Sequence, residues 1–173
     1  MGEQWDVLDE SGRKTGRLHE RGKPMAAGDF HLTVCVWMMN RKGEFLISKR
    51  TPNKLCPNMW ECTGGNAVAG DDSLKTAVKE VKEELGITLN PANGALIRRY
   101  KMGPDEYREG GELIDVWLFR QEADLSTVVF QPGETCGAMW AKKERINGMI
   151  KEKSFITWNI FSELDELFQN TAL

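Results

Sequence analysis

Apolar and polar positions divide the chain into segments with two different periods. His31–Met39 is a nine-residue apolar run, a turn at residues 40–43 follows it, and Glu44–Arg50 then alternates. This order predicts a β-hairpin, because such runs on either side of a glycine-containing turn are typical of paired strands. A similar pattern predicts an N-terminal hairpin made of Gln4–Val7 and Lys14–His19.

The rest of the chain contains segments with the alternating period of strands and segments with the period of helices. Thr51–Met59 holds two prolines and two asparagines, which predicts a loop. Near the C-terminus, apolar residues at helical spacing predict a helix over Trp158–Phe168. The other predicted elements are strands at Ala95–Met102, Leu113–Gln121 and Ala138–Ala141, and a helix at Lys143–Lys151.

The segment from Asp72 to Leu85 predicts the most informative helix. Asp72 is one of three adjacent N-cap candidates, and Gly86 sits where a glycine commonly ends a helix. Apolar residues recur at steps of three and four and predict one buried stripe. Its members are Leu74, Ala77, Val78, Val81 and Leu85.

Size and composition indicate a globular protein. The 173 residues, 40% apolar and 28% charged, predict a single domain over residues 1–173. No apolar run reaches the roughly 20 residues of a membrane span, and the N-terminus lacks the pattern of a secretory signal. Four cysteines at irregular spacing are typical of reduced thiols, so we expect a cytoplasmic protein. The net charge of −3, without a basic stripe, argues against binding of duplex nucleic acid.

Three glutamates on the predicted helix are the first candidate for chemistry. Glu80, Glu83 and Glu84 stand at i, i+3 and i+4, so their carboxylates emerge on one face at the edge of the core. We expect Glu84 to be a surface carboxylate. Like charges so placed repel, and divalent cations such as Mg²⁺ or Mn²⁺ would remove that conflict. The alternative is a solvated face in which Lys79 and Lys82 dilute the charge.

The sequence around this helix resembles a known motif. A glycine-rich loop at residues 63–71 leads into the helix, and such loops let backbone groups approach phosphate or metal closely. From Gly65 to Ile87 the chain resembles the Nudix box, G-x5-E-x7-R-E-U-x-E-E-x-G-U with U apolar, and six of eight defining positions match. The resemblance implies an α/β/α sandwich with a mixed sheet and an N-terminal hairpin extension (residues 1–28). It also implies that metals bind to Glu80, Glu83, Glu84 and the carbonyl of Gly64.

Two box positions differ from the motif. The first box glutamate is Asp71, and the box arginine is Lys79, which keeps the charge but loses the bidentate fork of arginine. Both lie outside the glutamate cluster, so we expect metal binding to survive. By its spacing, Lys79 would orient the glutamates one turn on, with Glu83 at i+4 as the first choice.

A second resemblance covers more of the chain. The first predicted hairpin, the Arg50-x3-Lys54 pair and Trp60 look like the isopentenyl-diphosphate isomerase branch of the Nudix superfamily. The resemblance implies that Arg50 and Lys54 grip a diphosphate, and His31 matches a metal-binding histidine of the isomerases. The isomerase cysteine and its partner histidine are absent, because that position falls on the pair Gly64-Gly65.

These observations predict a divalent-metal-dependent hydrolase of a phosphate anhydride, acting on a nucleoside diphosphate derivative or a related organic diphosphate. Either Glu84 or the late loop residue Glu134 would accept the proton from the attacking water. An isomerase-like activity and a non-catalytic binding module of the same fold are the alternatives. The N-terminal hairpin is a candidate arm for a homodimer.

Overall fold

The computed structural model describes residues 2–105, 108, 110–169 and 171, and its strands form one mixed sheet. The central strand β3 (Phe30–Met39) pairs parallel to β8 (Gly111–Arg120) and antiparallel to β6 (Thr63–Asn66) and β4 (Phe45–Arg50). The N-terminal hairpin consists of β1 (Gln4–Leu8) and β2 (Lys14–Glu20). Two strands, β5 (Trp60–Glu61) and β9 (Thr135–Ala141), pair with β4. The remaining strand, β7 (Gly94–Met102), pairs with β8.

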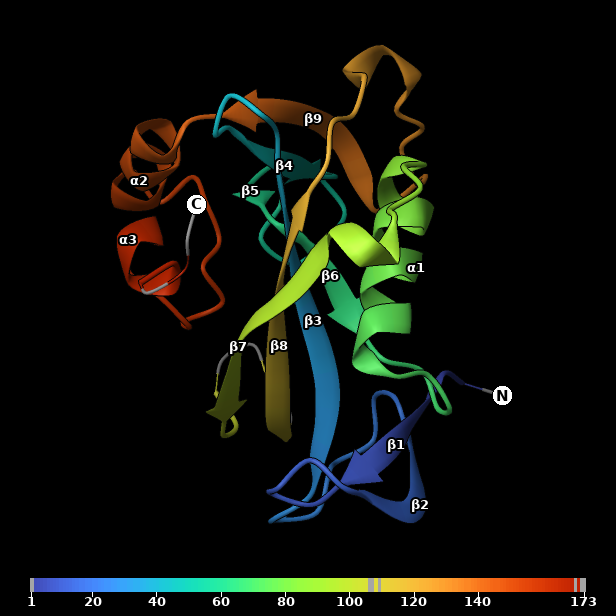
Figure 1. Cartoon of the computed structure of the whole chain (residues 1–173). Coiled ribbons are helices and arrows are strands. Elements are labelled where there is room, and N and C mark those ends of the chain that lie inside the picture. Colours follow the sequence, from blue (N-terminus) through green and yellow to red (C-terminus); the bar gives the residue numbers. More distant parts are fainter. Residues whose placement is uncertain (1, 106–107, 109, 170, 172–173) are drawn as a thin grey trace.

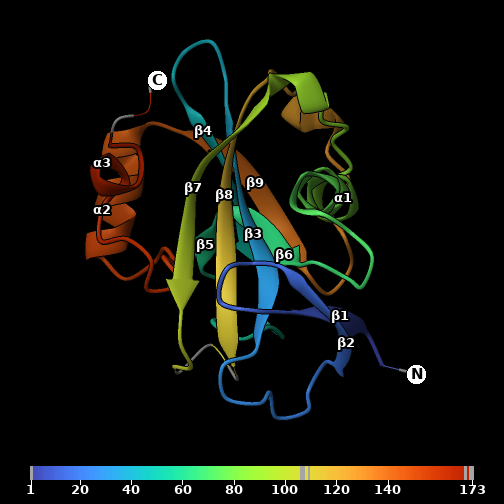
Figure 2. The same ribbon diagram turned by 60° about the horizontal axis from the view of Figure 1, so that its bottom comes forward.

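Helices cover both faces of this sheet (Figure 1). Helix α1 (Ser73–Leu85) packs on one face, and α2 (Lys143–Lys151) and α3 (Leu164–Leu167) lie on the other, which the turned view also shows (Figure 2). The short 3₁₀ helices η1 (Pro91–Asn93) and η2 (Leu125–Thr127) complete the secondary structure. The predicted α/β/α sandwich with a mixed sheet and an N-terminal hairpin is confirmed. In the described part of the chain, no helix is both long and apolar enough to span a membrane.

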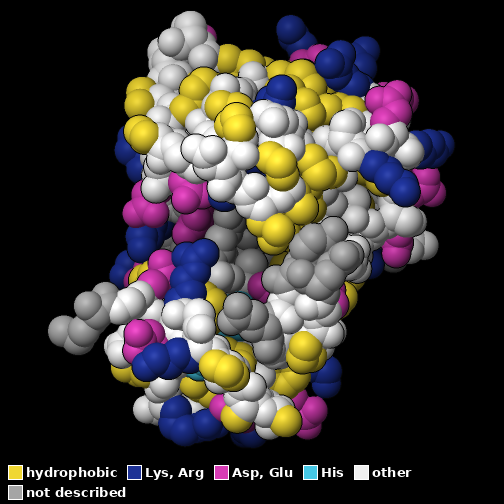
Figure 3. All heavy atoms as spheres, turned by 180° about the vertical axis from the view of Figure 1, so that it is seen from behind, with side chains coloured by type: hydrophobic (Ala, Val, Ile, Leu, Met, Phe, Trp, Pro, Cys, Tyr) yellow, Lys and Arg dark blue, Asp and Glu magenta, His cyan; other side chains and the backbone are white. Residues whose placement is uncertain are grey.

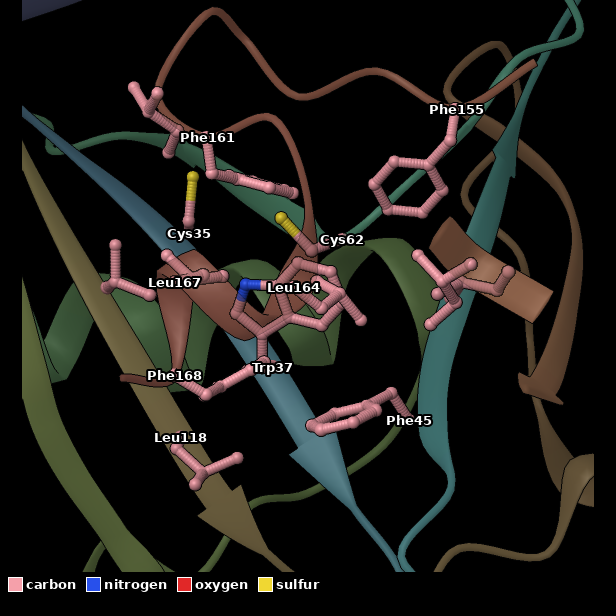
Figure 4. Packing of buried hydrophobic residues seen from close by; sticks show 14 of the residues in the cluster. Cys35, Trp37, Phe45, Cys62, Leu118, Phe155, Phe161, Leu164, Leu167 and Phe168 are labelled. Atoms are coloured by element: carbon pink, nitrogen blue, oxygen red, sulfur yellow. The ribbon is translucent and has the colours of Figure 1, made fainter. Parts of the chain in front are cut away.

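The period-two alternation of β3 divides the core into two layers. Its even-numbered residues from Val34 to Met38 belong to the layer under α1, and its odd-numbered residues from Cys35 to Met39 belong to the opposite layer. Trp37 is at the centre of the second layer, fully buried, with its ring 5.6 Å from Phe45 and 5.7 Å from Phe168 (Figure 4). This layer anchors the C-terminal segment to the sheet.

The predicted helix over Trp158–Phe168 is wrong, since only Leu164–Leu167 is helical. Trp158 and Asn159 have left-handed backbones, with φ of 52° and 59°, which a right-handed helix excludes. Ile160 and Phe161 are nevertheless buried. The apolar spacing of this segment therefore indicated correctly that its residues are buried against the sheet, but it did not indicate their backbone conformation.

Part of the glycine-rich segment is a strand where the sequence predicted a loop. Thr63–Asn66 pairs with β3, and Gly64 lies opposite Cys35. A Cβ at Gly64 would collide with the carbonyl oxygen of Val34, so only glycine permits this close approach of the two strands. Near the C-terminus, the strand predicted at Ala138–Ala141 begins three residues earlier, at Thr135.

Candidate active site

Helix α1 is fixed at both ends and along one face. The side chain of Asp72 accepts a hydrogen bond from the backbone N–H of Lys75 (2.8 Å), so Asp72 is the N-cap among the three candidates. Gly86 ends the helix in a left-handed conformation (φ 70°). Val81 and Leu85 are fully buried against the sheet. This anchoring sets the rotation of the helix and directs Glu80 toward β6.

Glu80 packs directly against the glycine-rich strand. Its carboxylate occupies the space that a Cβ on Gly65 would fill. The motif glycine therefore has a steric role, because any larger residue would displace the carboxylate. Burial, followed by the charge of Glu83, raises the pKa of Glu80 to about 7, while the charge of Lys79 opposes the rise.

Glu84 is buried, with 6% of its surface exposed, which corrects the expectation of a surface carboxylate. The helix packs so closely on the sheet that the edge of its apolar stripe is covered. Burial raises the pKa of Glu84 to about 8, and the charges of Glu61, Glu80 and Glu134 contribute. Within the described residues, the side chains of Glu80 and Glu84 form no hydrogen bond or ion pair. Neither carboxylate therefore has a positively charged partner, among the described residues, that would stabilise its ionised form.

The other two charged positions of the motif lie farther out. Glu83 is exposed, whereas Glu80 is half-buried and Glu84 is buried. Lys79 places its Nζ 3.9 Å from Oδ2 of Asp71. Its ion pair in the structure is thus with Asp71 and not with Glu83. The two residues that differ from the Nudix box are each other's neighbours.

A cavity of about 370 Å³ is lined by Gly65, against which Glu80 packs, and by Glu61 and Lys54, whose charges act on Glu84. In the space-filling view, the molecule is hollowed between its main body and the N-terminal hairpin, and acidic and basic side chains gather beside the hollow (Figure 3). Gly64 and Gly65 form part of the wall. The charged residues of the lining are Arg21, Arg50, Lys54, Glu61, Arg108, Glu112 and Glu134.

The predicted phosphate-binding pair lines this cavity, and both cations have carboxylate partners. Nη1 of Arg50 donates to both carboxylate oxygens of Glu61 (2.8 and 2.9 Å), and its Nε donates to the carbonyl of Leu55 (2.7 Å). Lys54 forms an ion pair with Glu134. The structure therefore brings Arg50, Lys54 and Glu134 into the same cavity.

Glu61 is a charged residue of the site that the sequence did not reveal. It lies in the two-residue strand β5, is buried, and is the first of the charges that raise the pKa of Glu84. Burial also raises the pKa of Glu61 itself, and the charge of Arg50 opposes the rise. A two-residue strand has no readable period, and the partner Arg50 is eleven residues away. The functional signal is that Glu61 and Arg50 are buried opposite each other, and no local sequence pattern reveals such a pair.

His31 lies in a polar group with Thr33, Arg108 and Glu112, of which the last three line the cavity. Its Nε2 is 3.5 Å from Oε1 of Glu112, which also accepts hydrogen bonds from Thr33 and Arg108. Burial alone would raise the pKa of Glu112, but hydrogen bonds from His31 and Thr33 and the charge of Arg108 hold it below its usual value. The carboxylate of Glu112 is thus already satisfied by protein donors.

The donor set suits a hard cation in its chemistry. The buried carboxylate of Glu84 and the half-buried one of Glu80 both have raised pKa values. Together with a glycine backbone at the cavity wall, they offer the oxygen ligands that Mg²⁺ and Mn²⁺ prefer. Among the residues that the structure describes, no three His, Cys, Asp or Glu side chains form a ready-made metal cluster. The fit rests on Glu80, Glu84 and the Gly64–Gly65 wall.

Comparison with known proteins agrees with the fold and the motif. Residues 29–163 match the NUDIX domain, which is more than half of the chain, so the chain belongs to the Nudix hydrolase family. It is 32% identical to an uncharacterized Nudix hydrolase of Listeria innocua over 99% of this chain and 98% of the relative. An uncharacterized Nudix hydrolase of Listeria monocytogenes is also 32% identical, with the same coverage. Nudix hydrolases act on small molecules and generally use divalent metals.

Solved structures and more distant relatives are less similar. The DR0079 protein of Deinococcus radiodurans shares the fold at 21% identity (TM-score 0.68, 88% of this chain and 91% of that one). The MutT protein of Methanosarcina mazei is 25% identical (TM-score 0.57, 74% and 84%). The isopentenyl-diphosphate Delta-isomerase of Escherichia coli is 26% identical, but only over 49% of this chain and 48% of that enzyme. The isomerase-like branch therefore stays a prediction.

Proposed function

We propose that the chain is a divalent-metal-dependent hydrolase of a phosphate anhydride in a nucleoside diphosphate derivative or a related organic diphosphate. The observation that carries the proposal is the pair Glu80 and Glu84, a half-buried and a buried carboxylate without a described partner, close to a cavity whose lining includes Arg50 and Lys54. Such a pair is costly to bury unless a positive charge neutralises it.

Glu80, Glu84 and the carbonyl of Gly64 would hold Mg²⁺ or Mn²⁺, with Glu83 as a further ligand from the exposed side of the helix. A bound divalent cation supplies neutralisation of the phosphate oxygens and a lowered pKa for the attacking water. Lys79 keeps Glu80 closer to its ionised form, because its charge lowers the pKa of that carboxyl. Its contact with Asp71 holds the lysine near the start of the helix.

Arg50 and Lys54 bind the phosphate that does not react, through charge-assisted hydrogen bonds. Both contribute from the cavity wall, where each is now paired with a glutamate. When a phosphate takes the place of Glu134 beside Lys54, that carboxylate becomes available to accept a proton from water. Glu84 is the alternative proton acceptor, as a carboxylate that the bound cation keeps ionised.

The isomerase alternative is weaker, because it needs an acid and a base at carbon. Cys62 is the thiol nearest to the isomerase position, and it is buried in the apolar layer beside Cys35 (Figure 4). A hydrogen bond with Cys35, together with burial, raises the pKa of Cys62 well above its usual value. A thiol that is held neutral in this way is a poor proton acceptor.

The binding-module alternative rests on the substitutions at Asp71 and Lys79. These residues retain opposite charges and lie 3.9 Å apart, so the substituted pair keeps its electrostatic attraction. A binding module would be stabilised by a ligand and would release no product.

The test is product release from a panel of nucleoside triphosphates, dinucleotides, nucleotide sugars and isoprenyl diphosphates, with Mg²⁺ and with Mn²⁺. The proposal predicts metal-dependent release from at least one class, and its loss in Glu84→Gln. Absence of release from every compound would overturn the proposal in favour of the binding module. Proton exchange into carbon without phosphate release would favour the isomerase.

A further inference from the structure

The loop between α2 and α3 brings one tryptophan to the cavity of the candidate active site. Trp158 lines this cavity together with Arg50 and Arg108. Its loop neighbours Ile156 and Ile160 are buried, whereas Trp158 is only half-buried. Because the neighbours already anchor the loop, packing does not explain why a tryptophan lines the cavity.

The backbone holds Trp158 in place at a conformational cost. Trp158 and Asn159 are consecutive left-handed residues, with φ of 52° and 59°, and neither is glycine. Such conformations are unfavourable for residues with a side chain, and they persist where the surrounding structure enforces them, often at functional sites. Here the N–H of Trp60 in β5 donates to the carbonyl of Ser154 (2.9 Å), and the N–H of Ile156 donates to the carbonyl of Trp60 (2.8 Å). These bonds fix the start of the loop relative to the sheet.

Trp158 contacts two arginines of the cavity. Cζ of Arg50 lies over its ring, 5.3 Å from the centroid, which is within the range of a cation–π interaction. Its backbone carbonyl accepts a hydrogen bond from the guanidinium of Arg108. Arg50 belongs to β4, and Arg108 lies in the connection between β7 and β8. One loop residue therefore links cations that come from two parts of the sheet.

The ring contact leaves a hydrogen-bond donor of Arg50 unused. A ring that lies against a guanidinium meets its face, whereas the N–H groups point outward in its plane. Nη1 of Arg50 donates to Glu61 and Nε donates to the carbonyl of Leu55. Nη2 has no hydrogen-bond partner among the residues that the structure describes. It is therefore the donor that Arg50 can offer to a ligand in the cavity without breaking the pair with Glu61.

We infer that Trp158 positions Arg50 for the diphosphate, by holding the guanidinium over its ring while Nη2 stays available to a phosphate oxygen. This inference rests on the proposed function, which assigns phosphate binding to Arg50, and deepens it. An aromatic ring suits this task, because it attracts the cation without the full negative charge that would compete with a phosphate. Trp158 is thus a positioning residue and takes no part in the chemistry.

A double-mutant cycle between Trp158 and Arg50 tests this inference. Trp158→Asn removes the ring and suits a left-handed backbone, and Trp158→Phe keeps an aromatic face. The second background is Arg50→Met/Glu61→Gln, which removes both charges and so leaves no buried ion without its partner. The probe is imidodiphosphate, a diphosphate analogue whose bridging nitrogen resists hydrolysis, titrated in Mg²⁺ by calorimetry. Thermal melting confirms that each variant is folded.

The matched control is Tyr100→Leu. It removes another contact between a ring and a guanidinium, since Cζ of Arg98 lies 5.8 Å from the centroid of Tyr100. Neither residue lines the cavity of the candidate active site. The control therefore reports what the loss of such a contact does away from the phosphate.

We expect Trp158→Asn to weaken imidodiphosphate binding about 10-fold, and Trp158→Phe to stay within about 3-fold of wild type. Tyr100→Leu should bind as wild type does. In the Arg50→Met/Glu61→Gln protein, Trp158→Asn should cause no further loss, because no guanidinium is left for the ring to hold.

Unchanged binding in Trp158→Asn would overturn the inference. Equal weakening with and without Arg50 would also overturn it, since the ring would then act on the ligand or the cavity wall directly. A wild-type protein that binds imidodiphosphate but hydrolyses no compound would refute the proposed function alone, and the cycle would still decide the role of Trp158. No binding to wild type would overturn both.

Discussion

The carboxylate of Glu80 lies where the side chain of residue 65 would begin, so the motif glycine and the motif glutamate occupy one space. Gly65 belongs to β6 and Glu80 to α1, two elements joined by the glycine-rich segment. The absence of a side chain at one position thus allows a carboxylate at the other to reach the cavity wall. This relationship explains in steric terms why a glycine fifteen residues earlier accompanies the acidic helix.

Gly65→Ala should displace Glu80 and weaken both Mn²⁺ binding and turnover by roughly 10- to 100-fold, as expected when a ligand loses its support. The matched control is Gly148→Ala in α2, where a Cβ would meet no atom within 4 Å. That control should keep full activity and equal or greater stability, because alanine favours helix. Unchanged Mn²⁺ affinity in Gly65→Ala would contradict the steric role of the glycine.

Glu84 should make the stability of the metal-free protein depend on pH. Its pKa is raised to about 8 in the folded state, so the folded protein retains a proton that the unfolded chain releases near its ordinary value of about 4.3. The stabilising contribution of Glu84 to the free energy of unfolding is therefore fully present below the pKa of the unfolded chain. It is lost as pH rises through about 8, the pKa in the folded state. Above pH 8, Glu84→Gln should melt on the order of 5 °C higher than wild type.

The same melting curves test metal binding. Mn²⁺ should stabilise wild type more at about pH 8 than at about pH 5, because cation and proton compete for the carboxylate. Glu84→Gln should show little of this effect. Parallel pH profiles for the two metal-free proteins would show that burial of Glu84 has no electrostatic cost.

Arg50 and Glu61 form a buried ion pair, with side chains 7% and 8% exposed, which predicts a large cost when one partner is removed. Arg50→Met should lower the free energy of unfolding by about 3 kcal/mol, since it leaves Glu61 buried without its cation. The double variant Arg50→Met/Glu61→Gln should recover most of that loss in urea denaturation.

The control for this pair is Lys54→Met, whose partner Glu134 is 40% exposed. Its loss of stability should stay below about 1 kcal/mol, as for other exposed ion pairs. Lys54→Met should nevertheless impair turnover, through weaker phosphate binding. Equal destabilisation by Arg50→Met and Lys54→Met would refute the distinction between a buried and an exposed pair.

Lys79 lowers the pKa of Glu80, so Lys79→Ala should shift the acidic limb of the pH–rate profile to higher pH. At neutral pH the rate should fall about 10-fold. Lys82→Ala is the matched control on the same helix, because Lys82 donates to the carbonyl of Gly86 and points away from the site. Its profile should coincide with that of wild type.

Much of the fold was predictable, because the relevant signals are local. The β3–β4 hairpin followed from an apolar run, a turn and an alternating run, and α1 followed from apolar spacing with Asp72 and Gly86 at its ends. The segment after α2 was not predictable in the same way. Its apolar residues pack around Trp37 on an irregular backbone, and spacing cannot distinguish that from a helix.

Only those residues of the site that belong to the sequence motif were predictable. The motif identified Glu80 and Glu84. It did not predict that Glu84 is buried, because its burial depends on how closely α1 packs against the sheet. Glu61 was missed because its burial depends on Arg50 in another strand. A smaller pocket between the N-terminal hairpin and the sheet was missed for the same reason, since it forms only when the hairpin folds back over His31.

The central claim is that Glu80 and Glu84 hold a divalent cation that hydrolysis requires. The most direct test titrates Mn²⁺ into wild type and Glu84→Gln at about pH 8, following bound Mn²⁺ by electron paramagnetic resonance and product release from a nucleoside diphosphate derivative in the same samples. We predict that binding and turnover saturate together in wild type, and that turnover falls at least about 100-fold in the variant. Turnover that persists in excess chelator, or a Glu84→Gln protein with most of the wild-type rate, would contradict the account.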